Sequence, residues 1–243
     1  EFGIVPPYVP RHEHINRYWG GDWKHDSPHL CNTMWGQHDM VRNAIASAAR
    51  NLRKPKLTTL WAAGFSFGKC HWVRAVPNDP LLAHVFDGEE FSRMARLFTH
   101  GYDTYTPSRS IVYHNYQPVP HIWATDSKKP VVDESKKSAA RLRTLLRMPK
   151  ASGEVLGRRY GLGTCRSFEQ LVNFTGVDPR RHREAHGTRC FVLRYVPWSA
   201  SQCALAVAAR GEGIDEYEHE VEHALLEAGG GGDGGGGGDG SGG

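Results

Sequence analysis

The sequence contains no apolar run close to the roughly 20 residues that a membrane-spanning helix needs, and its first residues show no signal-peptide pattern. We therefore expect no membrane segment in this chain. It also contains no internal repeat. Because the chain begins at Glu1 without a Met, and its opening is rich in proline and aromatic residues, we expect it to be a piece of a longer protein. The missing signal peptide then excludes nothing about targeting.

Cysteine is scarce and scattered. The count is five, an odd number, and no two cysteines form a Cys-x-x-Cys pair. This pattern favours reduced, mostly structural cysteines over a disulfide framework. The five are Cys31, Cys70, Cys165, Cys190 and Cys203.

The glycine content and the net charge both mislead when they are taken over the whole chain. Of the 28 glycines, 12 lie in residues 229–243, which reads as a flexible or disordered tail. All 30 basic residues lie at or before Arg210, whereas nine of the 26 acidic residues follow it. Residues 1–210 therefore carry a formal charge of +13, although the whole chain carries +4. A basic body admits anionic partners such as nucleotides, nucleic acid or phosphorylated surfaces.

The hydrophobic pattern predicts a mixture of helices and strands. Residues 1–35 read as loop, 38–52 as a helix, 57–67 as an apolar strand and 76–88 as a proline-rich loop. A helix is expected to begin at Glu89 and to end before Gly101, followed by a strand over 105–116 that Pro107 interrupts.

The second half of the sequence shows a similar mixture. Residues 117–134 read as exposed loop and 135–148 as a strongly basic helix. Ser167 and Gln170 form a capping-box pattern ahead of a short helix that Gly176 closes. An acidic amphipathic helix is expected over 214–225.

Two features could carry chemistry. Glu89 and Glu90 lie at a loop-to-helix junction, where the helix dipole stabilises carboxylates and free backbone N–H groups gather. Such carboxylates can bind sugar hydroxyls or a cation, although they are also compatible with a merely acidic first turn. His114 ends an apolar strand, a position that suits a metal ligand or a packed, hydrogen-bonded histidine.

Six motifs, in order, resemble the retaining polypeptide N-acetylglucosaminyltransferases, which attach α-GlcNAc to hydroxyproline or to Ser/Thr from UDP-GlcNAc. The resemblance spans about residues 30–178. The central block is also similar to the mucin-type polypeptide GalNAc-transferases. The motifs are WAAGFSF (61–67), VPNDP (76–80), FDGEE (86–90), LFTHGYDTY (97–105), IVYHNY (111–116) and RYGLGT (159–164).

The resemblance implies an α/β, GT-A-like glycosyltransferase fold with a divalent metal, usually Mn²⁺, that stabilises the leaving UDP. Matched residue by residue, His114 corresponds to a metal ligand and Glu89 to the glutamate that holds donor-sugar hydroxyls. The other matched positions are Glu90 and Asp87, which flank Glu89 at the catalytic centre, Ala63, Gly64 and Gly88 on the donor-sugar side, and Asn78 and Asp79 on the acceptor side. Because configuration is retained, the leaving phosphate can take the proton of the acceptor hydroxyl.

Two departures from the family pattern bear on activity. Asn78 replaces an aromatic residue of the family's Val-Pro-Tyr-Asp-Pro motif. No Asp-x-Asp or Asp-x-His motif occurs in the sequence, and in the family this motif lies before the matched region. We therefore expect a GT-A fold that is incomplete at its N-terminus and a chain that is inactive by itself.

The expected domains are a partial catalytic domain over 1–200, a C-terminal extension over 201–228 and the tail over 229–243. The alternative function is a non-catalytic relative that binds a protein or polyanion through the basic segment 128–194, which holds 16 Lys or Arg and six acids. An RNA-binding domain is a weaker alternative because no recognisable module accompanies the charge, so no nucleic-acid partner is expected. A protein acceptor is expected as partner. By resemblance the compartment is the cytoplasm, with the secretory pathway as the alternative.

Overall fold

The computed structural model describes residues 3–4, 26–44, 46–109, 111, 129–152, 157, 159–184, 192–198, 201 and 203. The chain divides into two compact units, Glu1–Cys203 and Ala204–Gly243, and every described residue belongs to the first. The acidic helix expected over 214–225 and the glycine-rich tail lie outside the described residues. The expected domain boundaries stay predictions.

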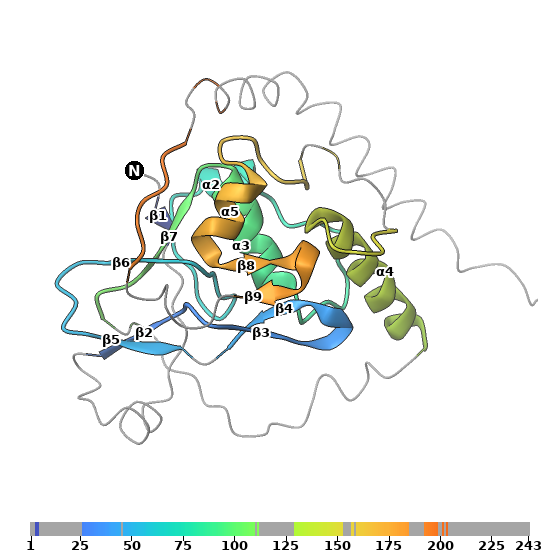
Figure 1. Cartoon of the computed structure of the whole chain (residues 1–243), viewed down its shortest axis with the longest axis horizontal. Coiled ribbons are helices and arrows are strands. Elements are labelled where there is room, and N and C mark those ends of the chain that lie inside the picture. The colour runs from blue at the N-terminus through green and yellow to red at the C-terminus, as the bar shows by residue number, and fades with distance from the viewer. Residues whose placement is uncertain are drawn as a thin grey trace, which may run out of the picture. The chain divides into compact units, whose positions relative to one another are not determined.

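The strands form several small sheets (Figure 1). In the largest, β7 (Asp103–Thr106) lies between β1 (Gly3–Ile4), to which it is parallel, and β6 (Lys56–Thr58), to which it is antiparallel. Three antiparallel pairs complete the set: β2 (Asp26–His29) with β5 (Ser47–Arg50), β3 (Thr33–Trp35) with β4 (Val41–Asn43), and β8 (Val177–Asp178) with β9 (Arg183–Glu184). This mixture of helices and small sheets is compatible with the α/β class.

Helix α3 (Glu89–Thr99) lies in the middle of the described structure and confirms the helix expected from Glu89 (Figure 1). It contacts β4, β7 and the helix α5 (Phe168–Thr175). Every residue from Phe91 to Thr99 is buried. Fully burying one large apolar side chain contributes about 1.5–3 kcal/mol, and the side chains of Phe91, Met94, Leu97 and Phe98 are all fully enclosed.

Helix α5 begins and ends where the sequence predicts. The Ser167 hydroxyl accepts a hydrogen bond from the Gln170 N–H, and the Gln170 side chain accepts one from the Ser167 N–H, which completes the capping box. Gly176 closes the helix with a φ of 77°, in the left-handed region that favours glycine. The helix packs on α3, where the rings of Phe174 and Phe98 stack with centroids 4.9 Å apart.

The basic helix is longer than expected. Helix α4 runs over Lys129–Leu145, so the prediction of loop up to residue 134 is wrong for its last part. Its early residues are too polar to show a helical pattern, and the proline at its second position is compatible with a first turn, where an N–H has no intrahelical partner. The inner side of the helix is buried and is formed by Ala139, Leu142 and Leu145. Among the described residues, the remaining helices are the short α2 (His71–Ala75) and two 3-10 turns, Gln37–Asp39 and Pro179–Arg181.

The helix expected over 38–52 is wrong, because strands β4 and β5 occupy this segment. Their partners β3 and β2 come from residues 1–35, which the sequence pattern presented as loop. Strand pairing, within the β3–β4 hairpin and between β5 and the more distant β2, overrides a local helical spacing of small apolar residues. A single sequence window cannot reveal such pairing.

Two further strands are shorter than expected. The segment 57–67 contributes only β6, and a turn lies at Ala63 and Gly64. Strand β7 ends at Thr106, immediately before Pro107, which cannot donate a hydrogen bond to a strand ladder. Residues 112–116 lie outside the described residues. The loop expected over 76–88 is confirmed.

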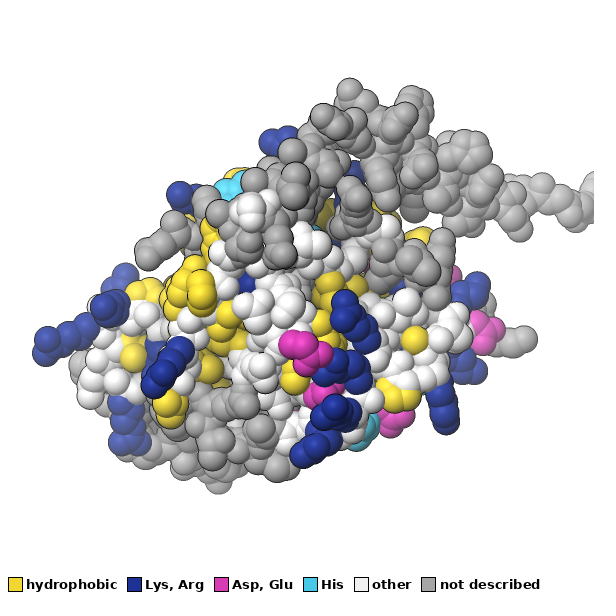
Figure 2. All heavy atoms as spheres, turned by 45° about the horizontal axis from the view of Figure 1, so that its top comes forward, with side chains coloured by type: hydrophobic (Ala, Val, Ile, Leu, Met, Phe, Trp, Pro, Cys, Tyr) yellow, Lys and Arg dark blue, Asp and Glu magenta, His cyan; other side chains and the backbone are white. Residues whose placement is uncertain are grey.

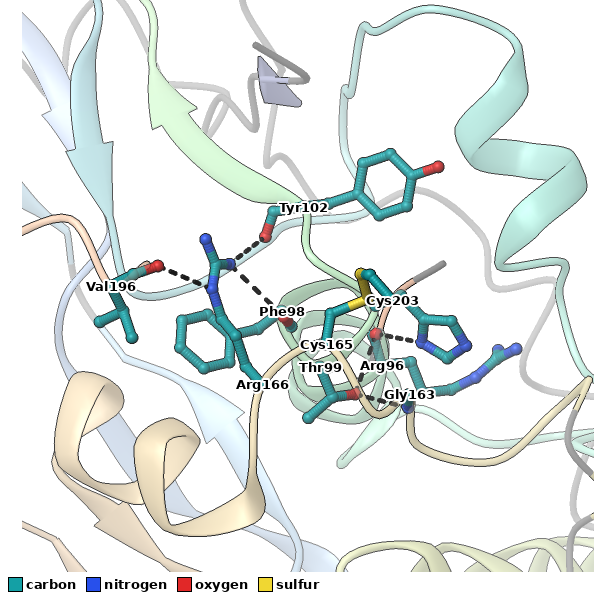
Figure 3. Close-up of a disulfide and its surroundings, with 10 residues drawn as sticks. Arg96, Phe98, Thr99, Tyr102, Gly163, Cys165, Arg166, Val196 and Cys203 are labelled. Carbon is teal, nitrogen blue, oxygen red and sulfur yellow. Dashed lines mark hydrogen bonds between the residues drawn. A yellow bond between two sulfur atoms is a disulfide. The ribbon is translucent and has the colours of Figure 1, made fainter. Parts of the chain in front are cut away.

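The prediction of reduced cysteines is wrong. Cys165 and Cys203 form a disulfide (Figure 3), and Cys31 is also disulfide-bonded. Cys70 is free and exposed. The pairing joins residues 38 positions apart, and nothing in the cysteine spacing distinguishes such a pair from unpaired thiols.

Next to this disulfide, Arg166 joins three parts of the chain (Figure 3). The side chain is fully buried, and its Nε donates to the carbonyl oxygen of Val196 at 2.9 Å. Its Nη1 donates to the carbonyl oxygen of Tyr102 at 3.1 Å, and its Nη2 lies 2.9 Å from a carboxylate oxygen of Asp103. The guanidinium also lies 4.5 Å from the ring centroid of Phe98. Arg166 therefore ties the end of α3 and the start of β7 to the segment 192–198.

We predict that peptide mapping of the folded protein without reductant recovers Cys165 and Cys203 in one linked peptide pair, while exposed Cys70 reacts with an alkylating reagent. Because the bond closes a loop of 38 residues, its reduction is expected to lower the free energy of unfolding by about 4 kcal/mol in the chain-entropy account. Free alkylation of Cys165 and Cys203 in the unreduced folded protein would contradict the pairing.

Candidate functional site

The two glutamates predicted to bind a ligand lie at the start of α3. Gly88 precedes them with a φ of 94°, and a Cβ at this position would lie 3.0 Å from the Cβ of Met40. The residue must therefore be glycine for the preceding loop to enter the helix in this direction. This geometry sets the direction in which Glu89 and Glu90 leave the helix start.

Glu90 joins three segments through hydrogen bonds. Its Oε1 accepts from the backbone N–H of Ala63 at 2.9 Å, and its Oε2 accepts from the Asn43 side-chain amide at 2.7 Å. The same amide nitrogen donates to the carbonyl oxygen of Trp61 at 2.9 Å. Glu90 thus holds the turn at Ala63 and Gly64, and strand β4, against the start of α3.

Glu89 differs from Glu90 because its side chain is exposed. Partial desolvation still raises the pKa of Glu89, and the positive charge of Arg93 opposes that rise. The pKa of Glu90 is also raised, and burial is the largest cause. The negative charges of Glu89 and Asp87 raise this pKa further, whereas the hydrogen bond from the Ala63 N–H and the positive charge of Arg42 lower it. Glu89 is therefore the carboxylate of the pair that a ligand can reach.

Asp87 is held by the β3–β4 hairpin. Its Oδ2 accepts from the backbone N–H of Gln37 at 2.6 Å, and its Oδ1 lies 3.5 Å from Nε of Arg42. A Cβ added to Gly36 would lie 2.2 Å from this carboxylate, so the hairpin turn closes directly over it. The carboxylate binds the hairpin turn in this structure, and its catalytic assignment stays a prediction.

Asp79, expected on the acceptor side, forms a buried ion pair. Its Oδ2 accepts from Nε of Arg141 in α4 at 2.7 Å, and its Oδ1 accepts from the backbone N–H of Leu81 at 3.0 Å. The neighbouring Asn78 is exposed. The loop 76–88 is thereby tied to α4, and Asn78 remains accessible for an acceptor contact.

Several buried polar atoms near the glutamates have no hydrogen-bond partner. They include Asn43 Oδ1, Trp61 Nε1, Asp87 Oδ1, and Nε and Nη1 of Arg93. Each such atom costs about 1–3 kcal/mol when it is left unsatisfied, so these atoms are candidates for contact with water or a ligand. Sequence reasoning missed Asn43, Trp61 and Arg93. Arg93 could have been found, because it lies four positions after Glu89 and therefore on the same side of the helix.

The proposed metal ligand His114 lies outside the described residues. Among the described residues, no group of three or more His, Cys, Asp or Glu side chains could hold a metal ion. Asp79, Asp87 and Glu90 already accept hydrogen bonds from protein donors. The described part of the chain therefore does not form a metal site by itself, and Mn²⁺ binding stays a prediction.

The described helices include none that is both long enough and apolar enough to cross a bilayer. On the face drawn in Figure 2, Lys and Arg side chains project from the described surface, and some of them lie beside acidic side chains. Among the described residues, Arg180 forms ion pairs with Glu169 and Asp178. The basic surface is therefore partly neutralised by local ion pairs.

A family model described as Glycosyltransferase (GlcNAc) matches residues 22–181. The match includes the turn at Ala63 and Gly64, all of α3 and α5, and the position of His114. No curated protein and no solved structure matches the chain.

We predict that Asp79→Asn lowers the free energy of unfolding by about 3–5 kcal/mol, because it removes the carboxylate charge that pairs with the buried Arg141. Asp133→Asn, which removes a carboxylate from the exposed side of α4, is the matched control and should change stability by less than about 0.5 kcal/mol. Urea unfolding measures both. Equal effects of the two substitutions would show that the ion pair does not anchor the loop.

Proposed function

The chain belongs to the Glycosyltransferase (GlcNAc) family, and on that premise we propose that it transfers GlcNAc from UDP-GlcNAc, with retention, to a hydroxyl of a protein acceptor. The acceptor hydroxyl belongs to hydroxyproline or to Ser/Thr. The observation that carries the proposal is an exposed carboxylate, Glu89, at a buried helix start that the family match covers.

The donor sugar fits between Glu89 and the turn at Ala63 and Gly64. Both turn residues are exposed and present little or no side chain, so a sugar ring can approach the backbone closely. Glu90 holds this turn in place through the Ala63 N–H. The Glu89 carboxylate can then accept hydrogen bonds from sugar hydroxyls, and charge-assisted hydrogen bonds of this kind are among the stronger ones in proteins.

In the transfer step the acceptor oxygen forms a bond to the anomeric carbon while the bond to UDP breaks on the same face. The proton of the acceptor hydroxyl passes to the leaving phosphate, so no strong protein base is needed. A carboxylate near the ring also stabilises positive charge that develops on the sugar. When it is bound, Mn²⁺ supplies Lewis-acid stabilisation of the leaving diphosphate, and the proposal assigns His114 as one of its ligands.

The disulfides bear on where this reaction takes place. The family resemblance favours the cytoplasm, where thiols are kept reduced. The Cys165–Cys203 bond and the disulfide-bonded Cys31 support the secretory pathway instead. The proposal therefore places the transferase in an oxidising compartment.

We predict that Glu89→Gln lowers kcat/KM for UDP-GlcNAc by about 10- to 100-fold, because a charged acceptor of sugar hydrogen bonds is replaced by a neutral one. The assay measures GlcNAc transfer by the longest natural form of the protein that contains this chain. Glu134→Gln, on the exposed side of α4, is the control and should leave transfer unchanged.

His114→Ala in the same assay should abolish the part of the transfer that EDTA removes. An enzyme that keeps its full activity after both the Glu89 and the His114 substitutions would contradict the site. Binding of a protein partner without any transfer would instead support the non-catalytic alternative.

A further inference from the structure

Arg93 is a buried cation without a full set of partners. Its side chain leaves helix α3 one turn after Glu89, and the residue is only 7 % exposed. Two of its nitrogens, Nε and Nη1, are enclosed and have no hydrogen-bond partner. Burial lowers the pKa of Arg93 to about 10, and the nearby Glu89 carboxylate opposes that shift. The guanidinium is therefore still charged at neutral pH.

The neighbouring Arg96 shows how this fold holds a buried arginine through backbone carbonyls, although its Nε also has no hydrogen-bond partner. Its Nη1 donates to the carbonyl oxygen of Pro77 at 2.7 Å, and its Nη2 donates to that of Arg159 at 3.0 Å. Arg166 is likewise bonded to carbonyl oxygens and to a carboxylate. Arg93 is the exception among these three buried arginines, because no such carbonyl bonds hold its guanidinium.

The Arg93 guanidinium is instead positioned by an aromatic ring. It lies 4.9 Å from the ring centroid of Trp72 in α2, and Trp72 itself packs partly buried against the core. A cation–π contact of this kind positions the guanidinium without using its N–H donors. Because Nε and Nη1 are enclosed, the remaining nitrogen, Nη2, is the donor that a planar or tetrahedral oxyanion can reach.

We propose that Arg93, held by Trp72, binds a phosphate of the nucleotide-sugar donor. This rests on the proposed function, since it places the phosphate next to the sugar that Glu89 binds. Side chains four residues apart on a helix lie about 5–6 Å apart at their Cβ atoms. One helix face then contacts the sugar through Glu89 and the adjoining phosphate through Arg93.

Electrostatics also favours the sugar at Glu89 and the phosphate at Arg93. An anionic phosphate supplies hydrogen-bond acceptors together with a second negative charge beside that of Glu89. Arginine is well suited to phosphate because its N–H groups match the spacing of phosphate oxygens. The Glu89 carboxylate itself lies at an exposed position at the start of the helix. Trp72 and Glu89 offset part of the cost of burying Arg93, and a bound phosphate would offset more of it.

The experiment measures thermal stabilisation of the longest natural form of the protein by UDP, by inorganic pyrophosphate and by uridine, each with Mn²⁺. The wild-type protein should be stabilised by UDP and pyrophosphate but much less by uridine, which has no phosphate. Arg93→Met should weaken UDP and pyrophosphate binding by about 10- to 100-fold. The control Arg74→Gln removes the same charge from an exposed position beside Trp72 and should leave binding unchanged.

A second readout separates binding from a structural role. Without ligand, Arg93→Met should melt at the same temperature as the wild type or higher, because it removes a buried charge that lacks partners. Arg96→Met should melt lower, because it leaves carbonyl acceptors unpaired. A large loss of stability in ligand-free Arg93→Met, or unchanged UDP binding by this variant, would overturn the proposal.

The same variants distinguish this inference from the proposed function. If GlcNAc transfer proceeds with an unchanged KM for UDP-GlcNAc in Arg93→Met, the phosphate assignment is wrong and the transferase activity stands. If the wild type binds UDP through Arg93 but transfers no GlcNAc, the phosphate site stands and the proposed reaction fails. A wild-type protein that neither UDP nor pyrophosphate stabilises would overturn the phosphate site.

Discussion

The burial of helix α3 is the constraint on which the described structure depends. Its apolar side chains form the centre of the core, and α5 and β7 pack against it. The start of the helix is fixed by Gly88, by the hydrogen bonds of Glu90 and by the hairpin that Asp87 holds. The end is fixed by Arg166. The position of Glu89 is therefore determined by contacts around the whole helix.

These contacts divide the acidic residues of the motif into two kinds. Asp87, Glu90 and Asp79 accept hydrogen bonds from the protein and connect neighbouring segments. Glu89 remains exposed at the helix start. A rigid frame with one accessible carboxylate suits a sugar site, because the bonded groups hold the geometry while the free group contacts the ligand. In this account most of the motif positions the site and few of its residues touch the substrate.

The sequence predicts the parts of this fold that depend on local signals. Helix α3 follows from its acidic first turn and apolar side, and α5 follows from the Ser167–Gln170 capping box. The strands β4 and β5 were mistaken for a helix because strand pairing overrides their local helical spacing. The Cys165–Cys203 disulfide was missed because it depends on a partner far away in the chain. Glu89 and Glu90 were recognised from a motif, whereas Asn43 and Arg93 matter through unpaired atoms that only the folded structure reveals.

The central claim is that the start of α3 presents Glu89 to the donor sugar. A crystal structure of the longest natural form of the protein with UDP-GlcNAc tests it most directly. The account predicts the pyranose between the Glu89 carboxylate and the turn at Ala63 and Gly64, with sugar hydroxyls within hydrogen-bond distance of that carboxylate. A sugar ring bound elsewhere, with Glu89 still facing solvent, would contradict it.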